Sequence, residues 1–125
     1  MTSALLASLL PGSLVVNATG LGKDRPGSPV PEGGVFPLDA LVWELNYRGE
    51  RLFLQQARAQ QDRQQLTITD GWDYFLHGWS YVMSRVFAFC LDDNMFAGLQ
   101  AVANELREEE EEGLFTNPSD VPGAV

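Results

Sequence analysis

Residues 14–23 (LVVNATGLGK) decide how the rest of the chain is interpreted. An apolar, β-branched run, typical of a buried strand in a parallel sheet, leads into Asn-Ala-Thr and two closely spaced glycines. A turn of small residues at the carboxyl end of such a strand brings backbone N–H groups and a hydroxyl to the edge where α/β proteins bind ligands. The spacing alone leaves two interpretations open: a ligand-facing loop, and a plain chain reversal at Gly20 and Gly22.

The bulk composition predicts one globular domain and excludes several kinds of protein. The chain has 125 residues, of which 45% are hydrophobic. Its net charge of −9, without clustered Lys and Arg, argues against binding to nucleic acid or to anionic membranes. The single cysteine, Cys90, excludes an internal disulfide and, with a single histidine, leaves no ligand set for a metal.

The sequence also gives expectations for the burial of Cys90 and for the cellular location of the chain. Cys90 lies in an apolar run, so we expect a buried thiol and a reducing, cytoplasmic setting. No Lys or Arg precedes the first apolar run, so a signal peptide is not expected. The longest apolar segment, residues 72–91, contains polar and charged side chains that would be costly in a bilayer.

Apolar periodicity and turn residues predict strands that alternate with helices. The strands are expected at residues 14–17, 40–46 and 66–69, the helices at 5–10, 51–63, 72–91 and 95–110, and a Pro- and Gly-rich surface loop at 23–38. In the second helix, Leu52, Leu54 and Ala59 should face the core. Asp70 is expected to cap the third helix, whose apolar spacing predicts a mostly buried element. This alternation implies a parallel sheet with right-handed crossovers.

The order of the motifs resembles the C-terminal portion of the shikimate/quinate dehydrogenase family. The motifs are NAT-x-x-G at residues 17–22, the Pro/Gly loop, an acidic-x-x-Tyr segment at 44–47, and Asp70-Gly71 before a long apolar helix. The resemblance covers about residues 5–106. It implies an NADP-dependent oxidoreductase that reduces 3-dehydroshikimate to shikimate in aromatic amino-acid biosynthesis.

The resemblance also implies the fold. We expect an α/β, partial Rossmann-like domain, with a three-stranded parallel sheet and flanking helices, that lacks the first half of the nucleotide-binding fold. Residues 1–112 would form the C-terminal half of the NADP-binding domain plus returning C-terminal helices. Residues 113–125 would be an acidic, Pro- and Gly-containing tail without fixed structure.

Residue by residue, the resemblance implies cofactor contacts and one substrate contact. The cofactor-binding residues would be Asn17, Ala18, Thr19, Gly22, Leu45 and Gly71. This agrees with their chemistry, because a Thr hydroxyl can bond a ribose or an amide, and small residues let the backbone approach a ligand. Tyr47 matches a substrate-binding tyrosine whose phenol could bond a hydroxyl or carboxylate, and a plain aromatic at the sheet edge is the alternative.

Several departures from the family pattern reduce the expected activity. Gly78 stands where the long helix presents a glutamine to the substrate, Glu44 replaces an aspartate, and Lys23 replaces an apolar residue. His77 could take over a polar contact, although a core or interface histidine is the alternative.

The catalytic Lys/Asp pair and the G-x-G-x-x-G/A phosphate turn are also missing, and Lys23 has no partner acid implied by its spacing. No catalytic residue is therefore predicted, and NADP should bind this chain alone weakly or not at all.

Two functions remain open at this point. One is a C-terminal fragment of a shikimate dehydrogenase-like oxidoreductase, inactive as an isolated chain, and the retained NAT-x-x-G loop and Gly71 favour it. The other is a non-catalytic interaction or oligomerisation module derived from that family, which Gly78 favours. Either function predicts a homo-oligomer or a partner chain that covers the open sheet edge and the apolar helix. The aromatic residues expected at that interface are Trp72, Phe75, Trp79, Phe87 and Phe89.

Overall fold

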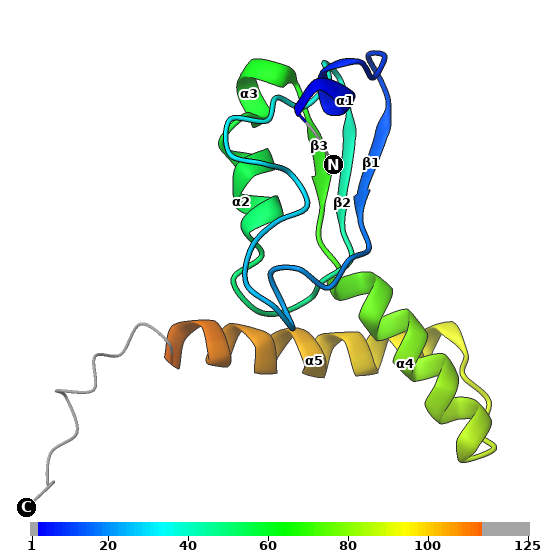
Figure 1. The fold of residues 1–125 in the computed structure, drawn as a ribbon. Coiled ribbons are helices and arrows are strands. Elements are labelled where there is room, and N and C mark those ends of the chain that lie inside the picture. The colour runs from blue at the N-terminus through cyan, green and yellow to red at the C-terminus, as the bar shows by residue number, and fades with distance from the viewer. Residues whose placement is uncertain (1–2, 114–125) are drawn as a thin grey trace, which may run out of the picture. The chain divides into compact units, whose positions relative to one another are not determined.

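The computed structural model describes residues 3–113 and the side chains of residues 3–108. The strands are β1 (Leu14–Asn17), β2 (Leu41–Glu44) and β3 (Thr67–Thr69), and the helices are α1 (Ser3–Ala7), α2 (Leu52–Arg58), α3 (Gln61–Gln64), α4 (Trp72–Val86) and α5 (Asp93–Gly113) (Figure 1). The chain divides into two compact units, Met1–Phe75 and Leu76–Val125. All three strands belong to the first unit.

The strands form one open parallel sheet in the order β1-β2-β3. In the register of β1 with β2, Asn17 lies opposite Glu44, and in that of β2 with β3, Val42 lies opposite Ile68. The expected α/β class and the partial Rossmann-like architecture are therefore confirmed. Because the strands are parallel, their carboxyl ends lie at the same edge of the sheet.

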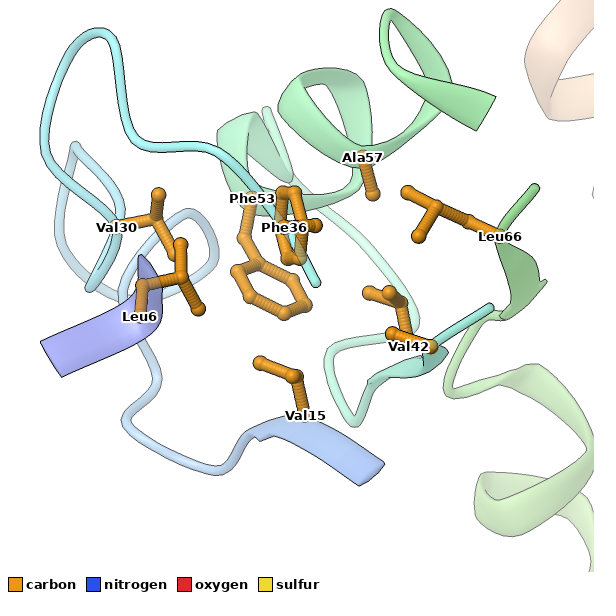
Figure 2. Packing of buried hydrophobic residues seen from close by; sticks show 9 residues of the cluster. Leu6, Val15, Val30, Phe36, Val42, Phe53, Ala57 and Leu66 are labelled. Carbon is orange, nitrogen blue, oxygen red and sulfur yellow. The ribbon is translucent and has the colours of Figure 1, made fainter. Parts of the chain in front are cut away.

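The hydrophobic core covers one face of this sheet. Strand alternation turns Val15 and Val42 to this face, on which α2 packs against β2 and β3. The rings of Phe36 and Phe53 meet edge to face at 5.6 Å in the middle of the cluster (Figure 2). The buried cluster consists of Leu6, Val15, Val30, Phe36, Ala40, Val42, Phe53, Ala57 and Leu66.

The loop between β1 and β2 contributes to this core. It contains neither helix nor strand, as its prolines and glycines predict, but it is not only a surface loop. Val30 and Phe36 are 2% and 1% exposed, and burial of a side chain of this size stabilises a fold by about 1.5–3 kcal/mol. Gln56 and Gln60 of the neighbouring helical segment hold the loop through bonds to Val30 O and Gly34 O at 3.1 and 2.9 Å.

Among the described residues, the opposite face of the sheet is only partly covered, because the Tyr74 ring meets the Trp43 ring edge to face at 5.9 Å. Leu14 and Leu41 are 59% and 48% exposed, although apolar residues of a parallel sheet are normally covered on both faces. Trp43 is half-buried, and its Nε1 is buried without a hydrogen-bond partner among the described residues. A hollow of about 290 Å³ on the sheet is lined by Leu14, Leu41, Val42, Trp43, Thr67 and Thr69.

The expected helix at residues 51–63 is two shorter helices, α2 and α3. The prediction that Ala59 faces the core is wrong, because Ala59 lies at the break after α2 and is exposed. Leu54 is buried as expected, while Leu52 is only half-buried. The helical period instead turns Phe53 and Ala57 inward beside Leu54.

In the second unit, the prediction of a mostly buried helix is wrong. Trp79 of α4 is 56% exposed and Phe87, just beyond its end, is 71% exposed. The buried residues of α4 are Leu76, Ser80 and Ser84, which recur every four positions and form a narrow line. The two serine hydroxyls donate to backbone carbonyls at 2.6 and 2.7 Å, so they can be buried at little cost.

The end of α4 and the whole of α5 also differ from expectation. α4 ends at Val86, and Cys90 beyond it is exposed, so the prediction of a buried thiol is wrong. α5 begins where the Asp92 carboxylate accepts a bond from Met95 N at 2.8 Å. Gly113, expected in the tail, ends α5, and residues 114–125 lie outside the described part of the chain. Among described residues, no helix has both the length and the apolar character that crossing a bilayer requires.

Candidate functional site

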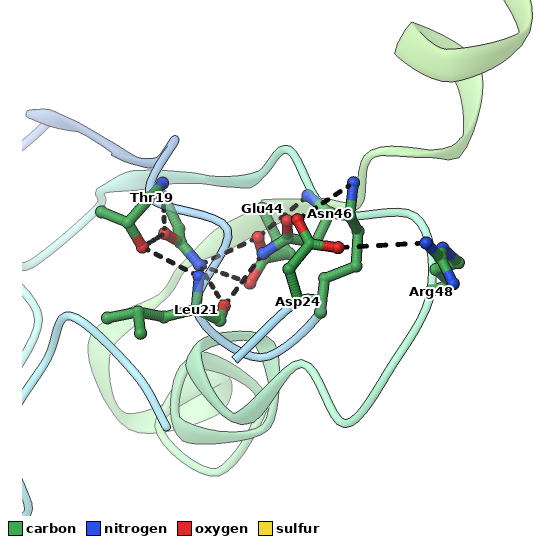
Figure 3. Close-up of polar contacts among 8 residues, drawn as sticks. Thr19, Leu21, Asp24, Glu44, Asn46 and Arg48 are labelled. Atoms are coloured by element: carbon green, nitrogen blue, oxygen red, sulfur yellow. Dashed lines mark hydrogen bonds and ion pairs between the residues drawn. The ribbon is translucent and has the colours of Figure 1, made fainter. Parts of the chain in front are cut away.

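The candidate site lies at the carboxyl edge of the sheet, where β1 and β2 end side by side. Asn17 and Glu44 are the last residues of these strands, and both are 0% exposed. Asn17 Nδ2 donates to the two Glu44 carboxylate oxygens at 3.0 and 2.9 Å (Figure 3). A buried polar pair thus joins the two strands at the point where their loops begin.

Burial and hydrogen bonding shift the pKa of the Glu44 carboxyl in opposite directions. Burial raises its pKa above the ordinary value of a glutamate, because a charged carboxylate loses its hydration in the interior. Bonds from Asn46 N, at 3.0 Å from Oε1, and from Asn17 favour the charged form and oppose this shift. Desolvation is the larger effect, so Glu44 holds its proton to a higher pH than an exposed glutamate does.

The same polar cluster fixes the loop that follows β1. Asn17 Oδ1 accepts bonds from Thr19 N at 3.1 Å and from Thr19 Oγ1 at 2.7 Å. Leu21 O accepts from Asn17 Nδ2 at 3.2 Å and from Asn46 Nδ2 at 3.0 Å. The Thr19 hydroxyl also accepts from Leu21 N at 3.2 Å. Ala18 and Thr19 lie exposed at the surface of this loop.

Two glycines bring this loop and the neighbouring segments into close contact. Gly22 has a φ of +89°, and a Cβ added there would lie 3.1 Å from Arg51 Cα. Its carbonyl accepts a bond from Arg51 N at 2.9 Å. Gly71 is buried, and a Cβ there would collide with the carbonyl oxygen of Leu45. Both positions therefore require glycine for packing, whatever they contact in a ligand.

Leu45 and Tyr47 continue the chain beyond β2. Leu45 is half-buried, and its N–H donates to Asn17 O at 3.1 Å. Tyr47 is half-buried and stacks on Phe75 with ring centroids 4.0 Å apart. Its hydroxyl makes no hydrogen bond within the described part of the chain. All the predicted site residues thus lie at one edge of the first unit, and their roles toward NADP and substrate stay predictions.

Asp70 caps α4 as the sequence predicts. Its Oδ1 accepts a bond from Trp72 N at 3.1 Å, and its Oδ2 lies 3.5 Å from Arg51 Nη1. The side chains of both partners of this ion pair are about one-fifth exposed, at 20% and 21%. The pair therefore ties the start of α2 to the start of α4 within the first unit.

Charged residues around Tyr47 form a group that the sequence interpretation missed. Lys23 forms an ion pair with its chain neighbour Asp24 at 3.7 Å. Asp24 also lies 3.9 Å from Arg48 (Figure 3). Both partners adjoin residues already singled out, since Asp24 follows Lys23 and Arg48 follows Tyr47. The signal was their charge and position at the carboxyl ends of two strands.

The second unit carries His77 and Gly78. His77 is exposed and stacks on Phe96 at 4.1 Å, so it is not a core histidine. Apart from Gly78 itself, its chain neighbours and the nearby backbone of α4, no described atom lies within 4 Å of a Cβ added to Gly78. Nothing described therefore fills the space in which the family pattern has a glutamine side chain.

The described residues do not provide the phosphate-binding part of an NADP site. That part needs a glycine-rich turn that leads from a strand into a helix N-terminus. Here β1 leads into a loop, in which Gly20 and Gly22 serve turns, and the next element is β2. Within residues 3–108, no group of His, Cys, Asp and Glu side chains is arranged to hold a metal ion.

Comparison with known proteins gives partial matches. No family model matches the chain, and no solved structure matches it. Shikimate dehydrogenase (NADP(+)) from Streptococcus pneumoniae strains R6 and TIGR4 is 44% identical over 59 residues. The match covers 46% of this chain but only 21% of each relative, so the chain spans about a fifth of their length. This similarity supports a relationship to the shikimate dehydrogenases.

Proposed function

We propose that this chain is the C-terminal part of a shikimate dehydrogenase-like, NADP-dependent oxidoreductase and is inactive by itself. The observation that carries the proposal is the 44% identity to the Streptococcus pneumoniae shikimate dehydrogenase over 59 residues. The arrangement of NAT-x-x-G, Leu45, Tyr47 and Gly71 at one sheet edge supports it. A cytoplasmic location and an oligomeric or partner-bound state belong to the same proposal.

In this proposal, the chain supplies the nicotinamide and substrate side of a larger site. Ala18 and Thr19 present backbone and a hydroxyl oxygen on the exposed surface of the loop after β1. The Tyr47 hydroxyl, which has no hydrogen bond within the described residues, donates to a hydroxyl or carboxylate of the substrate. Asn17 and Glu44 hold these loops in place from inside the sheet.

The remainder of the site must come from residues that this sequence does not contain. The sequence has no G-x-G-x-x-G turn, and its single lysine, Lys23, lies on the loop beside Tyr47. Phosphate binding and proton transfer therefore require another segment or another chain. Without them, the isolated chain should neither hold NADPH tightly nor transfer a hydride.

A second candidate function is a non-catalytic interaction module derived from the same family. Exposed apolar side chains on the sheet face opposite the core favour it, because Leu14 and Leu41 there are 59% and 48% exposed. An apolar surface of this kind on a parallel sheet marks a place where another layer packs. In the enzyme proposal, that layer is the other half of the nucleotide-binding domain, and in the module proposal it is an unrelated partner or a second copy.

Cofactor binding by a reconstituted mixture tests the proposal. This chain is mixed with the portion of the Streptococcus pneumoniae enzyme that precedes the matched 59 residues, and tryptophan fluorescence is followed during titration with NADPH. The proposal predicts saturable binding by the mixture and none in the micromolar range by this chain alone. A complex that forms but does not bind NADPH would favour the interaction module.

The control variant carries Leu14→Glu and Leu41→Glu on the sheet face opposite the core. These substitutions place charges where the other layer should pack, while both positions are exposed in this chain. The variant should keep its own fold, shown by circular dichroism, and should fail to restore NADPH binding. Micromolar binding of NADPH by the unmixed chain would contradict the proposal.

A further inference from the structure

Among the described residues, the hydrogen-bond partners of the Glu44 carboxyl are all donors. Asn17 Nδ2 donates to Oε1 at 3.0 Å and to Oε2 at 2.9 Å, and Asn46 N donates to Oε1 at 3.0 Å (Figure 3). A bond from the Asn46 side chain adds to them. An ionised carboxylate only accepts hydrogen bonds, whereas a protonated one must also donate. The arrangement is therefore the one that belongs to the ionised form of Glu44.

The position of the Asn17 amide leaves no place for a carboxyl proton. Its Nδ2 is almost equally distant from the two Glu44 oxygens, so it lies between them, on the side of the carboxyl group where a proton is most stable. A proton on Oε2 would point at the Nδ2 hydrogens, and two donors would face each other. Both side chains are 0% exposed, so bulk water does not replace the lost bonds. Protonation of Glu44 therefore requires the Asn17 amide to turn over and present Oδ1 to the new proton.

The same amide holds the loop after β1. Its Oδ1 accepts bonds from Thr19 N at 3.1 Å and from Thr19 Oγ1 at 2.7 Å, and its Nδ2 donates to Leu21 O at 3.2 Å. In a turned amide, N–H groups would face Thr19 N and an oxygen would face Leu21 O, so both of these backbone bonds would be lost. Leu21 O keeps its bond from Asn46 Nδ2 at 3.0 Å, so the loss falls mainly on Thr19.

We propose that Glu44 is a proton-operated switch of the loop after β1: the ionised carboxylate holds the Asn17 amide in the orientation that fixes Thr19, and protonation turns the amide and releases Thr19. The switch uses residues of this chain alone, so it depends on neither NADP nor a partner chain. It acts on the exposed part of the loop, Ala18 and Thr19. With Glu44 ionised, Thr19 Oγ1 donates its proton to Asn17 and offers a ligand only an acceptor. With Glu44 protonated, that proton becomes available to a ligand.

The charged groups around Glu44 favour its ionised form less than burial disfavours it. Strands β1 and β3 contain no charged side chain. Arg51, before α2, favours the ionised form, and it is itself paired with Asp70 at 3.5 Å. Burial outweighs these effects and raises the pKa of Glu44, so the switch operates at a higher pH than an exposed glutamate would allow. The other charged side chains of the adjoining loops and of the first turn of α4 are Lys23, Asp24, Arg25, Arg48, Glu50 and Asp73.

A pH titration of the full chain by NMR tests this switch. In protein labelled with ¹³C and ¹⁵N, the Glu44 ¹³Cδ resonance reports protonation of the carboxyl, and the Thr19 amide reports the state of the loop. The two resonances should shift with the same midpoint, while the Ile68 amide of β3 should not shift. The scalar coupling across the hydrogen bond between Thr19 ¹⁵N and Asn17 ¹³Cγ should be present with Glu44 ionised and lost when Glu44 is protonated.

Two results of this titration would overturn the proposal. One is a Thr19 amide whose resonance and coupling stay unchanged while Glu44 is protonated. The other is a Glu44 carboxyl that stays ionised until the chain unfolds, which circular dichroism at each pH would show.

A neutral variant shows whether the carboxylate is responsible. Glu44→Gln has a donor and an acceptor, as the protonated acid does, so its Asn17 amide should be turned at every pH. Its Thr19 amide should lie at the position that the natural chain reaches in its acid form, without the coupling. Glu50→Gln, at an exposed position before α2, is the matched control and should titrate as the natural chain does. A folded Glu44→Gln that keeps the coupling would contradict the switch, and if this variant does not fold, the titration of the natural chain decides.

Discussion

The stability of the fold should depend on pH, because Glu44 is a buried titratable group. Its side chain is fully buried and bonded to Asn17 and to Asn46 N, yet burial still raises its pKa. An acid with a raised pKa binds its proton more tightly in the folded state than in the unfolded state. Its contribution to stability is therefore fully present below the unfolded pKa and is lost as the pH rises through the folded pKa.

The first prediction concerns this contribution of Glu44. The quantity of interest is the difference between the free energy of unfolding of the natural chain and that of the Glu44→Gln variant. This difference should decrease as the pH rises from about 4, where the unfolded glutamate titrates. The slope cannot exceed about 1.4 kcal/mol per pH unit for one proton. Urea denaturation of both proteins at a series of pH values measures this difference. A difference that grows with pH would show that hydrogen bonding outweighs desolvation at Glu44.

A second prediction compares a glycine in a close packing contact, Gly71, with a glycine that has space for a side chain, Gly78. Gly71→Ala should lower the free energy of unfolding by about 1–3 kcal/mol, because the added methyl group collides with Leu45 O. Gly78→Ala is the matched control, since nothing lies within 4 Å of its Cβ position on α4. It should raise stability by about 0.5–1 kcal/mol through helix propensity. Equal effects of the two substitutions would argue against the close approach at Gly71.

Among the elements, the strands were predictable because their signals are local. β1 and β2 are β-branched, apolar runs that end at polar residues, and each begins within one residue of its predicted start. The split of the predicted helix at residues 51–63 was not predictable, because Ala59 and Gln60 contain no helix breaker. The burial of Asn17 and Glu44 as a pair also depends on strand register, which local sequence does not encode.

The residue that follows α3 gives a prediction about the stability of the end of this helix. Gln65 follows α3 with a φ of 54°, in the left-handed region that costs a residue with a Cβ about 1–2 kcal/mol. Gln65→Gly should therefore raise the free energy of unfolding by about 0.5–1 kcal/mol, after the greater entropy of unfolded glycine is subtracted. Gln64→Gly, at the last residue of α3, should lower it by a similar amount. Chemical denaturation of both variants checks the opposite signs.

At the scale of the whole molecule, sequence periodicity predicted which residues line one side of α4 but not whether anything covers them. The spacing of Trp79, Met83 and Val86 is that of a buried helix, yet they are 56%, 42% and 69% exposed. Burial depends on other layers, and the described residues contain too few to cover these side chains. The charged group around Tyr47 was missed for a related reason, since it joins two loops that lie far apart in the sequence.

These exposed residues predict association in solution. We expect the chain to form dimers or larger assemblies, because contiguous apolar side chains of this kind are characteristic of interfaces. Phe87→Ser, at a position 71% exposed, should shift the assembly toward monomer, whereas Gln61→Ser on the exposed side of α3 should not. Sedimentation velocity over a range of concentrations measures this. A compact monomer at every concentration would contradict the expectation.

The most direct test of the proposed enzyme origin is a chimera. The 59-residue segment of the Streptococcus pneumoniae shikimate dehydrogenase that matches this chain is replaced by the matching segment from this chain. If this chain comes from such an enzyme, the chimera should oxidise shikimate with NADP⁺, and Tyr47→Phe in the chimera should lower kcat/KM about tenfold. This chain alone should show no activity. A chimera that folds with a cooperative melting transition but does not oxidise shikimate would contradict this origin.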